Sequence, residues 1–290
     1  MQSSTPHLVL APDAAIDLQM HTIYSDGTWT PESLMDYLVS EQFGLVAITD
    51  HDRVDTIASL QQLATQKGLP LLAAAEISAS WKSEPTDVLC YGFGPAYNEL
   101  RDVAQDIAHR QSENTREVCE NLQRAGMSFL DSQELARLLE KPSAQQPHAL
   151  VALLKTHGYG TGVPSAGKLI TDAGFSWATC DIADAVDAAH RSGGVCLLAH
   201  PGRGEGYIRY DTNLLDELRK DVPIDGFEVY YPAHTPEQIA MYREYAEKHS
   251  LLTSSGSDSH GPEKKPIKYR AELSRRLLER LGIEIQYMIG

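Results

Sequence analysis

Short apolar segments alternate with amphipathic segments along most of this chain, and this alternation limits the folds that it can adopt. The strand candidates are rich in leucine and β-branched residues, and they span residues 15–20, 44–49, 69–78, 87–93, 194–200, 225–231 and 251–258. Helical patterns lie between most of them, at residues 30–42, 56–68, 181–194, 236–249 and 270–282. Strands that alternate with helices predict an α/β protein with a parallel sheet, and this many repeats favour closure into a barrel.

Residues 97–175 interrupt the alternation. This stretch contains helical patterns at residues 98–126, 131–141 and 147–158 and no clear strand. We therefore predict a barrel in two parts, residues 15–96 and 176–290, with a helical subdomain inserted at 97–175 as a lid.

The charge of the chain restricts its partners. It has 40 acidic and 25 basic residues among 290, a formal net charge of -15. This charge repels a long polyanion, so we expect a small phosphorylated ligand and no long nucleic acid. Such a ligand requires cations that reverse the charge locally.

Two features indicate a soluble, cytoplasmic protein. The 4 cysteines have no CxxC spacing and lie in apolar or helical surroundings, which is typical of buried free thiols in a reducing compartment. Residues 1–15 lack the basic and apolar regions of a signal peptide, and we expect them to form a loose leader. No apolar run is long enough to span a membrane, and the oligomeric state is left open.

Polar residues collect at the C-terminal ends of the strand candidates. They are His21, Asp26, Asp50, His51, Asp52, Glu76, His200, Arg203, Asp258 and His260. Singly, such an aspartate is more often a helix cap, and such a histidine is more often an ordinary polar residue. In a parallel barrel, however, these strand ends meet at one mouth, where divalent cations can compensate buried carboxylates. Imidazole and carboxylate ligands together suit manganese, zinc or iron better than calcium.

Five motifs in this order carry a family resemblance: DLQMHTIYSDGTWTP, AITDHD, AAAEIS, LLAHPGR and SSGSDSHG. They resemble the PHP (polymerase and histidinol phosphatase) family of metal-dependent phosphoesterases over residues 15–94 and 181–262. The segment QPHALVALLKTHG also resembles the insert of PHP nucleotide phosphatases. The resemblance implies a distorted (β/α)7 barrel with two or three divalent ions at its strand ends, manganese being favoured over zinc, iron(II) or magnesium.

The resemblance also implies roles for individual residues. The metal ligands would form three groups: His21, Glu76 and Asp258; Glu76, Asp87 and His148; and Asp26, His51 and His260. Glu76 would bridge the first two ions, and His200 and Arg203 would face the substrate phosphate. The catalytic residues would thus be Glu76, His200 and Arg203.

This chain departs from the family pattern at three positions. Gln19 stands where the family has the first histidine of HxH, and its neutral amide predicts weaker metal binding at the first site. Asp87 stands at a common histidine position, keeps a ligand and favours a harder ion such as manganese or magnesium. Gln146 replaces a frequent arginine and removes a possible phosphate clamp.

The leading functional hypothesis is a metal-dependent phosphoesterase that acts on a nucleotide or nucleoside bisphosphate. A 5′-3′ exonuclease acting on short oligonucleotides is the nearest alternative. Gln19 and Gln146 motivate a second one, a metal and phosphate-ligand binding protein that has lost turnover. A third is a cyclic amide or ester hydrolase that uses the same metals.

Secondary roles are expected for residues near these motifs. We expect one of Asp50 and Asp52 to orient His51 and the other to cap the next helix. Glu228 is expected behind the ligands, and His234 is expected to be solvated.

Overall fold

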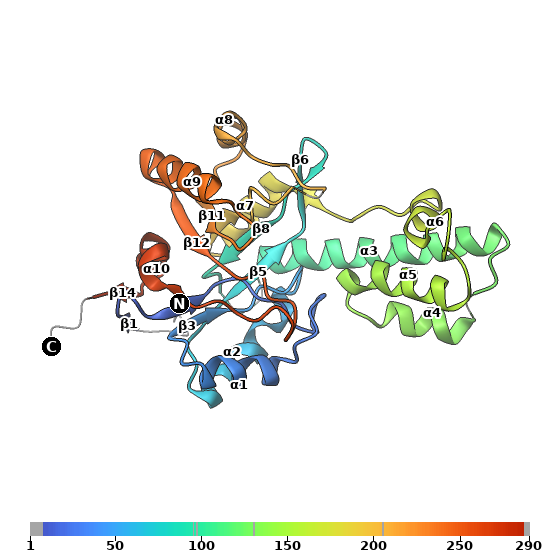
Figure 1. Cartoon of the computed structure of the whole chain (residues 1–290), viewed down its shortest axis with the longest axis horizontal. Helices are drawn as coiled ribbons and strands as arrows, with labels where there is room; N and C mark the ends of the chain where they lie inside the picture. The colour runs from blue at the N-terminus through green and yellow to red at the C-terminus, as the bar shows by residue number, and fades with distance from the viewer. Residues whose placement is uncertain (1–7, 95, 97, 130, 205, 287–290) are drawn as a thin grey trace. The chain divides into compact units, whose positions relative to one another are not determined.

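A computed structural model describes residues 8–94, 96, 98–129, 131–204 and 206–286. The described residues divide into two compact units (Figure 1). The first comprises Met1–Ala104 and Cys180–Gly290, and the second comprises Gln105–Thr179. The domain limits at residues 97 and 175, and the lid role, stay predictions.

Among its described residues, the first unit has two larger sheets and two smaller ones. The first sheet has the strand order β12 (Leu252–Ser255), β11 (Gly226–Tyr230), β10 (Val195–Leu198), β8 (Val88–Tyr91) and β5 (Ala74–Ile77). The second has the order β13 (Tyr269–Arg270), β2 (Ala15–Asp17), β3 (Leu45–Ala47) and β4 (Leu71–Leu72). Aliphatic side chains from both sheets, among them Ile16, Leu45 and Leu197, share one buried core. The predicted α/β class is confirmed.

The described strands do not close into a continuous barrel. The two sheets are joined at their strand ends by isolated bridges, Met20 with Ser259 and His51 with Glu76. The (β/α)7 form of the fold therefore stays a prediction.

Not all strand pairs are parallel, in contrast to the prediction. Strand β8 is antiparallel to both β5 and β10, and β13 is antiparallel to β2. Only β6 (Ala79–Trp81) and β7 (Glu84–Pro85), which pair with each other, lie between β5 and β8. A parallel neighbour needs a long crossover, usually a helix, so this short connection returns the chain in the opposite direction. Strand β9 (Cys180–Asp181) adds to β6 in a small third sheet.

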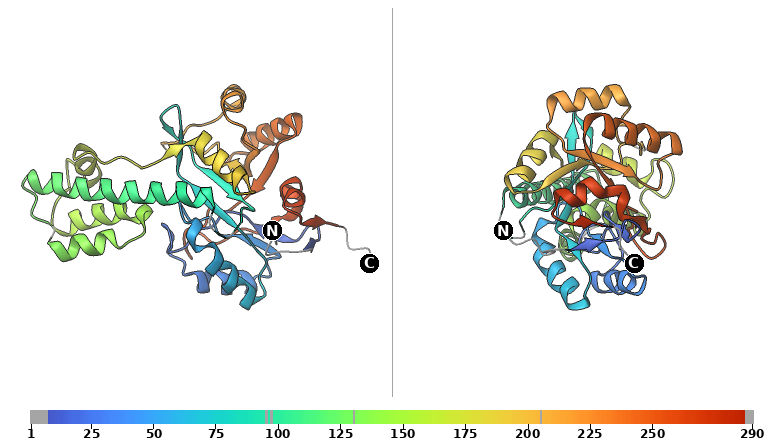
Figure 2. Two further views of the ribbon diagram at one scale, coloured as in Figure 1. Left: turned by 180° about the vertical axis from the view of Figure 1, so that it is seen from behind. Right: turned by 90° about the vertical axis from the view of Figure 1, so that its left-hand side faces the viewer.

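Helices lie along the outside of the sheets in the first unit (Figure 2). They are α1 (Pro31–Ser40), α2 (Ile57–Lys67), α7 (Ile182–Arg191), α8 (Thr212–Asp221), α9 (Pro236–His249) and α10 (Arg275–Arg280), with 3₁₀ turns at Val54–Thr56 and Ala271–Ser274. The start predicted for α1 is confirmed, because the Thr30 side chain accepts a bond from Ser33 N and Pro31 begins the helix. Gly68 ends α2 with a φ of 67°, a left-handed conformation that glycine adopts without a Cβ penalty.

The expectation of a loose leader is wrong for part of the N-terminal segment. Residues 1–7 lie outside the described residues, but β1 (Val9–Leu10) pairs in parallel with β14 (Glu284–Ile285). Leu10 and Ile285 are buried in the core of the first unit, so apolar burial fixes this segment.

The second unit is helical in its described residues, 105–129 and 131–179. It contains most of α3 (Glu99–Arg124), together with α4 (Ser132–Leu139), α5 (Gln146–Thr156), α6 (Ala166–Asp172) and a 3₁₀ turn at Ser143–Gln145. Its own core includes Val118, Phe129, Leu150 and Leu154. Among the described helices of the whole chain, none is both long and apolar enough to cross a membrane.

Candidate metal centre

The strand ends of the first unit bring the predicted ligands together. His21 follows β2, and the bridge between Met20 and Ser259 places it beside Asp258, which follows β12. The bridge between His51 and Glu76 does the same for the residues after β3 and within β5. These two isolated bridges, which lie outside the regular strand pairs, thus occur where the polar residues of the two sheets meet.

The first group surrounds a buried imidazole. His21 Nε2 lies 3.1 Å from Glu76 Oε2 and 3.3 Å from Asp258 Oδ1, and all three side chains are buried. Neither ring nitrogen of His21 has a partner at hydrogen-bond angles. Donor atoms that converge without bonding one another fit a shared cation, because each keeps a lone pair for it.

Two further groups adjoin the first. His51, Glu76 and Asp87 form one, and His21, Asp26, His51 and His260 form the other; within each, the ligand atoms lie within 4.8 Å of one another. Asp26 Oδ2 is 3.2 Å from His260 Nε2 and 4.0 Å from His51 Nε2. The groups share His21, His51 and Glu76, so cations held there would be neighbours.

His148 belongs to the second unit, on α5. Its ring centroid lies 6.1 Å from that of Trp177, a half-exposed residue of the same unit. Its role as a metal ligand stays a prediction. Gln146, at the start of the same helix, is buried and its amide donates to Ser112 Oγ and to two backbone carbonyls, so it acts within its own unit.

Gln19 lies within the ligand cluster, as its place in the motif predicts. Its side chain is buried, and Nε2 donates to Glu76 Oε2 at 3.1 Å. The amide oxygen Oε1 has no hydrogen-bond partner. Gln19 thus supports the central carboxylate and leaves one buried acceptor unused.

The charges of this cluster are strongly coupled. Burial opposes ionisation of Glu76, but His51, His200 and His21 outweigh it and hold the pKa of Glu76 well below its usual value. Burial likewise opposes protonation of His51, and the carboxylates of Glu76 and Asp26 still raise its pKa to about 9. Burial and the negative charge of Glu76 raise the pKa of Asp87. A protonated imidazole can therefore supply here the positive charge that a metal ion would supply.

Backbone strain gathers at the same place. His200, Asp258 and Asp52 have φ values of 28°, 53° and 55°, in a region that side chains with a Cβ rarely adopt. Surrounding contacts must maintain such conformations, which concentrate at functional sites. Asp52 is held by Ser78, whose backbone N and hydroxyl donate to it at 3.0 and 2.9 Å.

His200 and Arg203 follow β10 in one tight turn. His200 Nε2 lies 3.1 Å from Glu76 Oε1, and the half-buried Arg203 places its guanidinium 4.9 Å from the ring centroid of Tyr207. Glu228 is buried behind them and accepts a bond from His200 N at 3.1 Å. Burial, with the nearby charges of Asp258 and Glu76, raises the pKa of Glu228 well above its usual value.

The expectation that His234 is solvated is wrong. His234 is buried, donates from Nδ1 to Val229 O at 2.9 Å and accepts from Gly202 N at 3.0 Å. It thereby holds the turn that carries Arg203. Its position at the start of α9 gave no sign of this role.

The helix cap expected from Asp50 or Asp52 is also wrong. Asp50 accepts bonds from Thr22 N, Thr22 Oγ1 and Ser25 Oγ, each at 2.7 Å. It organises the loop between His21 and Asp26, while Asp52 is occupied by Ser78. Both carboxylates support the loops that present ligands and leave α2 without a side-chain cap.

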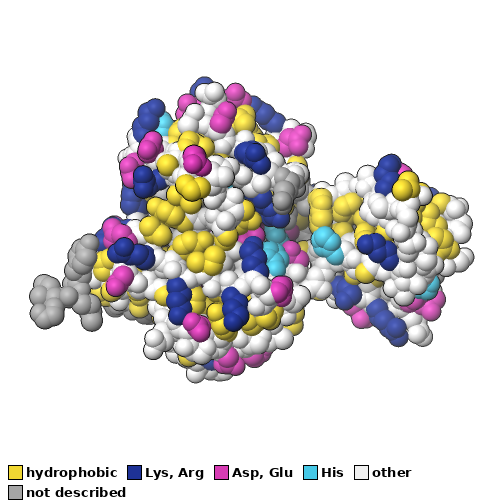
Figure 3. Space-filling model, viewed as in Figure 1, with side chains coloured by type: hydrophobic (Ala, Val, Ile, Leu, Met, Phe, Trp, Pro, Cys, Tyr) yellow, Lys and Arg dark blue, Asp and Glu magenta, His cyan; other side chains and the backbone are white. Residues whose placement is uncertain are grey.

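Three residues at the cluster were not predicted to belong to it. Tyr207 interacts electrostatically with the Asp87 carboxylate, and the Tyr231 hydroxyl donates to Asp258 Oδ2 at 3.2 Å. Lys264 Nζ lies 3.5 Å from the same Asp258 oxygen. Tyr207 and Lys264 reach the cluster from loops that no spacing in sequence marks, whereas Tyr231 directly follows β11. In Figure 3, histidine, acidic and basic side chains adjoin on the visible face of this unit.

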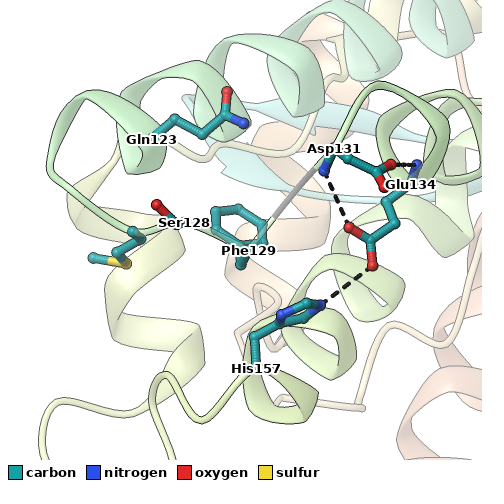
Figure 4. A pocket seen from close by; sticks show the side chains of 7 residues that line it. Gln123, Ser128, Phe129, Asp131, Glu134 and His157 are labelled. Carbon is teal, nitrogen blue, oxygen red and sulfur yellow. Dashed lines mark hydrogen bonds and ion pairs between the residues drawn. The ribbon is translucent and has the colours of Figure 1, made fainter.

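A separate cavity of about 360 Å³ lies in the second unit (Figure 4). It is lined by Gln123, Met127, Ser128, Phe129, Asp131, Glu134 and His157. Glu134 accepts from Asp131 N at 3.1 Å as part of the cap of α4, and it lies 3.2 Å from His157 Nε2. Asp131 and Glu134, the acidic residues that line this cavity, therefore already form the N-terminal cap of α4.

Comparison with known proteins identifies relatives along most of the chain. The chain is 28% identical over 262 residues to a 3′,5′-nucleoside bisphosphate phosphatase of Chromobacterium violaceum, covering 86% of this chain and 88% of the relative. It is 28% identical over 251 residues to the 5′-3′ exoribonuclease Rnm of Salmonella typhimurium, covering 85% of each. No family model matches.

A solved structure has the same fold. It is a protein of Bifidobacterium adolescentis described as a metal-dependent phosphoesterase, with a TM-score of 0.73 and 24% identity over 93% of this chain and 98% of that one. At this identity the likeness establishes the fold.

Proposed function

We propose that this chain, a member of the PHP family of metal-dependent phosphoesterases, hydrolyses a phosphate ester of a nucleoside bisphosphate. The resemblance seen in the five sequence motifs is confirmed by the relatives and by the shared fold. Activity as a metal-dependent phosphoesterase follows from them. The bisphosphate substrate is our proposal, supported by the relative that bears this activity in its name and by the acidic charge of the chain.

One observation carries the assignment. Three groups of histidine and carboxylate side chains lie within the first unit, and His21, His51 and Glu76 each belong to two of them. The buried ring nitrogens of His21 lack hydrogen bonds, so this donor set fits divalent cations. We propose two or three ions, with manganese favoured because carboxylates and imidazoles contribute together.

The residues around the cluster have complementary roles. Bound divalent ions supply an activated water and neutralise phosphoryl charge. Glu76 holds the centre, with Gln19 and His200 fixing its two oxygens. Arg203 is placed to bind phosphate oxygens with its guanidinium fork. His200 is placed to donate a proton to the leaving alkoxide.

A second candidate is 5′-3′ exonuclease activity on short oligonucleotides. It is favoured by the similarity to exoribonuclease Rnm, which is equal in identity to that with the phosphatase. The remaining alternative is a protein that binds metal and a phosphate ligand but has lost turnover. Gln19, at the position of an expected histidine ligand, is the reason to consider it.

A substrate screen tests these assignments. Phosphate release would be measured in manganese with a nucleoside 3′,5′-bisphosphate, nucleoside monophosphates and a labelled dinucleotide, with Glu76→Gln as the inactive control. We expect the bisphosphate to be cleaved with the highest kcat/KM. Faster release of mononucleotides from the dinucleotide would favour the exonuclease, and saturable binding without any hydrolysis would favour the binding protein.

A further inference from the structure

Asp258 has two carboxylate oxygens that face different surroundings. Oδ1 lies 3.3 Å from His21 Nε2 and 3.5 Å from His260 Nδ1, on the side of the ligand cluster. Oδ2 accepts from the Tyr231 hydroxyl at 3.2 Å and lies 3.5 Å from Lys264 Nζ. Asp258 therefore separates the cluster from a second polar region.

The loop that carries Lys264 is held by several bonds. Lys264 N donates to Gly261 O at 3.0 Å, and the Lys264 carbonyl accepts from the Ser259 hydroxyl. That hydroxyl also accepts from Trp29 Nε1 at 3.1 Å. The backbone of Lys264 is thus fixed close to Asp258, while its side chain is 45% exposed and open to a ligand.

Tyr231 lies beside Lys264 and in the electrostatic field of Arg203. Lys264 Nζ is 5.8 Å from the centre of its ring, and Arg203 interacts electrostatically with both Tyr231 and Asp258. The Tyr231 ring also lies 5.4 Å from the ring of His200. Lys264 therefore approaches Asp258 from the loop after β12, at 3.5 Å from Oδ2.

Lys264 has capacity for a further anion. It has three ammonium protons, and its one ionic partner among the described residues is a potential metal ligand. Cation binding at Asp258 would weaken the pull of this carboxylate on Lys264 and leave the ammonium available. A lysine at this position suits a phosphate group that is held as a point charge.

We propose that Lys264, beside the ring of Tyr231, forms a second phosphate subsite, which binds the phosphate group that is not hydrolysed. This inference rests on the proposed phosphoesterase function and specifies its substrate class: a molecule with two phosphate groups, one at the ligand cluster beside Arg203 and one beside Lys264. Asp258 Oδ1 faces His21 and His260 of the ligand cluster, so a phosphate near Oδ2 would lie outside the reacting position.

The neighbouring lysine provides a matched control. Lys265 is also exposed, but its Nζ lies 5.5 Å from the ring centre of Tyr37. Lys264→Met and Lys265→Met remove the same charge and keep similar side-chain lengths. Any effect of net charge alone is therefore common to both variants.

The kinetic test compares a nucleoside 3′,5′-bisphosphate with the nucleoside monophosphate that carries only the scissile phosphate. We expect Lys264→Met to raise KM for the bisphosphate roughly ten- to hundredfold, the effect of losing one charge-assisted contact, and to change KM for the monophosphate by much less. Lys265→Met should leave both constants unchanged. Equal effects of Lys264→Met on the two substrates would overturn the subsite.

Manganese binding gives a readout independent of turnover. Lys264→Met should bind manganese as tightly as the wild type or more tightly, because an ammonium that competes for Asp258 has been removed. Weaker metal binding would assign Lys264 a structural role and refute the proposal. Absence of hydrolysis of any phosphoester by the wild type would instead refute the proposed function, so the two failures are distinguishable.

Discussion

Replacement of Gln19 by histidine tests how the cluster is tuned. In the structure, Gln19 Nε2 donates to Glu76 Oε2 at 3.1 Å, and Oε1 is a buried acceptor without a partner. An imidazole would exchange this weak neutral oxygen for a strong nitrogen ligand. Changes to groups that support metal ligands typically alter affinity ten- to hundredfold, and we expect a gain of about this size, equivalent to about 1.4–2.8 kcal/mol.

The control variant is Gln19→Leu, which has a similar volume and no ligand atom. It loses a hydrogen bond to a charged acceptor, which contributes about 1.5–3 kcal/mol, and it removes an unpartnered buried oxygen, which costs about 1–3 kcal/mol. Because these contributions offset, Gln19→Leu should differ from wild type by only about 1 kcal/mol in the free energy of unfolding. A comparison of metal binding in folded proteins is therefore possible.

Calorimetric titration of chelator-treated protein with manganese measures the effect. We expect Gln19→His to bind its tightest manganese ion ten- to hundredfold more strongly than wild type, and Gln19→Leu to bind it no more strongly than wild type. If Gln19→His binds no more tightly than Gln19→Leu, residue 19 does not face the metal, and the account of the first site is wrong.

Two further predictions concern pH and Tyr207. In the absence of metal, the raised pKa of His51 stabilises the fold below about pH 6.5, and this contribution is lost as the pH rises to about 9. Manganese must displace the His51 proton, so its apparent affinity should instead rise about tenfold per pH unit over this range; titrations at several pH values check both trends. Tyr207→Phe removes the hydroxyl that interacts electrostatically with Asp87. It should lower the metal affinity of the group that Asp87 forms with His51 and Glu76 roughly tenfold, measured by metal content after dialysis. Unchanged metal content would exclude this role of Tyr207.

The ligand cluster could be predicted from sequence because its members follow a simple rule of position. His21, His51 and Asp258 each lie three or four residues beyond the end of a short strand, and strand ends in α/β proteins meet along one edge. In the structure these residues and Glu76 belong to groups that share members, and within each group the ligand atoms lie within 4.8 Å of one another. Their individual roles as ligands stay predictions that metal binding by variants will test.

Other parts of the site could not be predicted, because they depend on loops. Tyr207 and Lys264 reach the cluster from segments with no periodic pattern, so only the folded backbone brings them to Asp87 and Asp258. The antiparallel direction of β8 also depends on a local feature, a hairpin where a helix would be needed for a parallel crossover. Periodicity identifies strands, and the length of a connection determines their direction.

The amide at Gln19 has a physical advantage that offsets its weakness as a ligand. An amide donates to Glu76 at every pH, whereas a histidine that also bound metal would have to present a lone pair to the ion and could not direct the same nitrogen to the carboxylate. Gln19 thus holds the central carboxylate, and the neighbouring imidazoles supply positive charge to it. A preorganised carboxylate with one weak ligand favours rapid exchange of the ion at the first site over tight retention. The Gln19→His variant should accordingly release manganese more slowly to a chelator, even where its affinity gain is small.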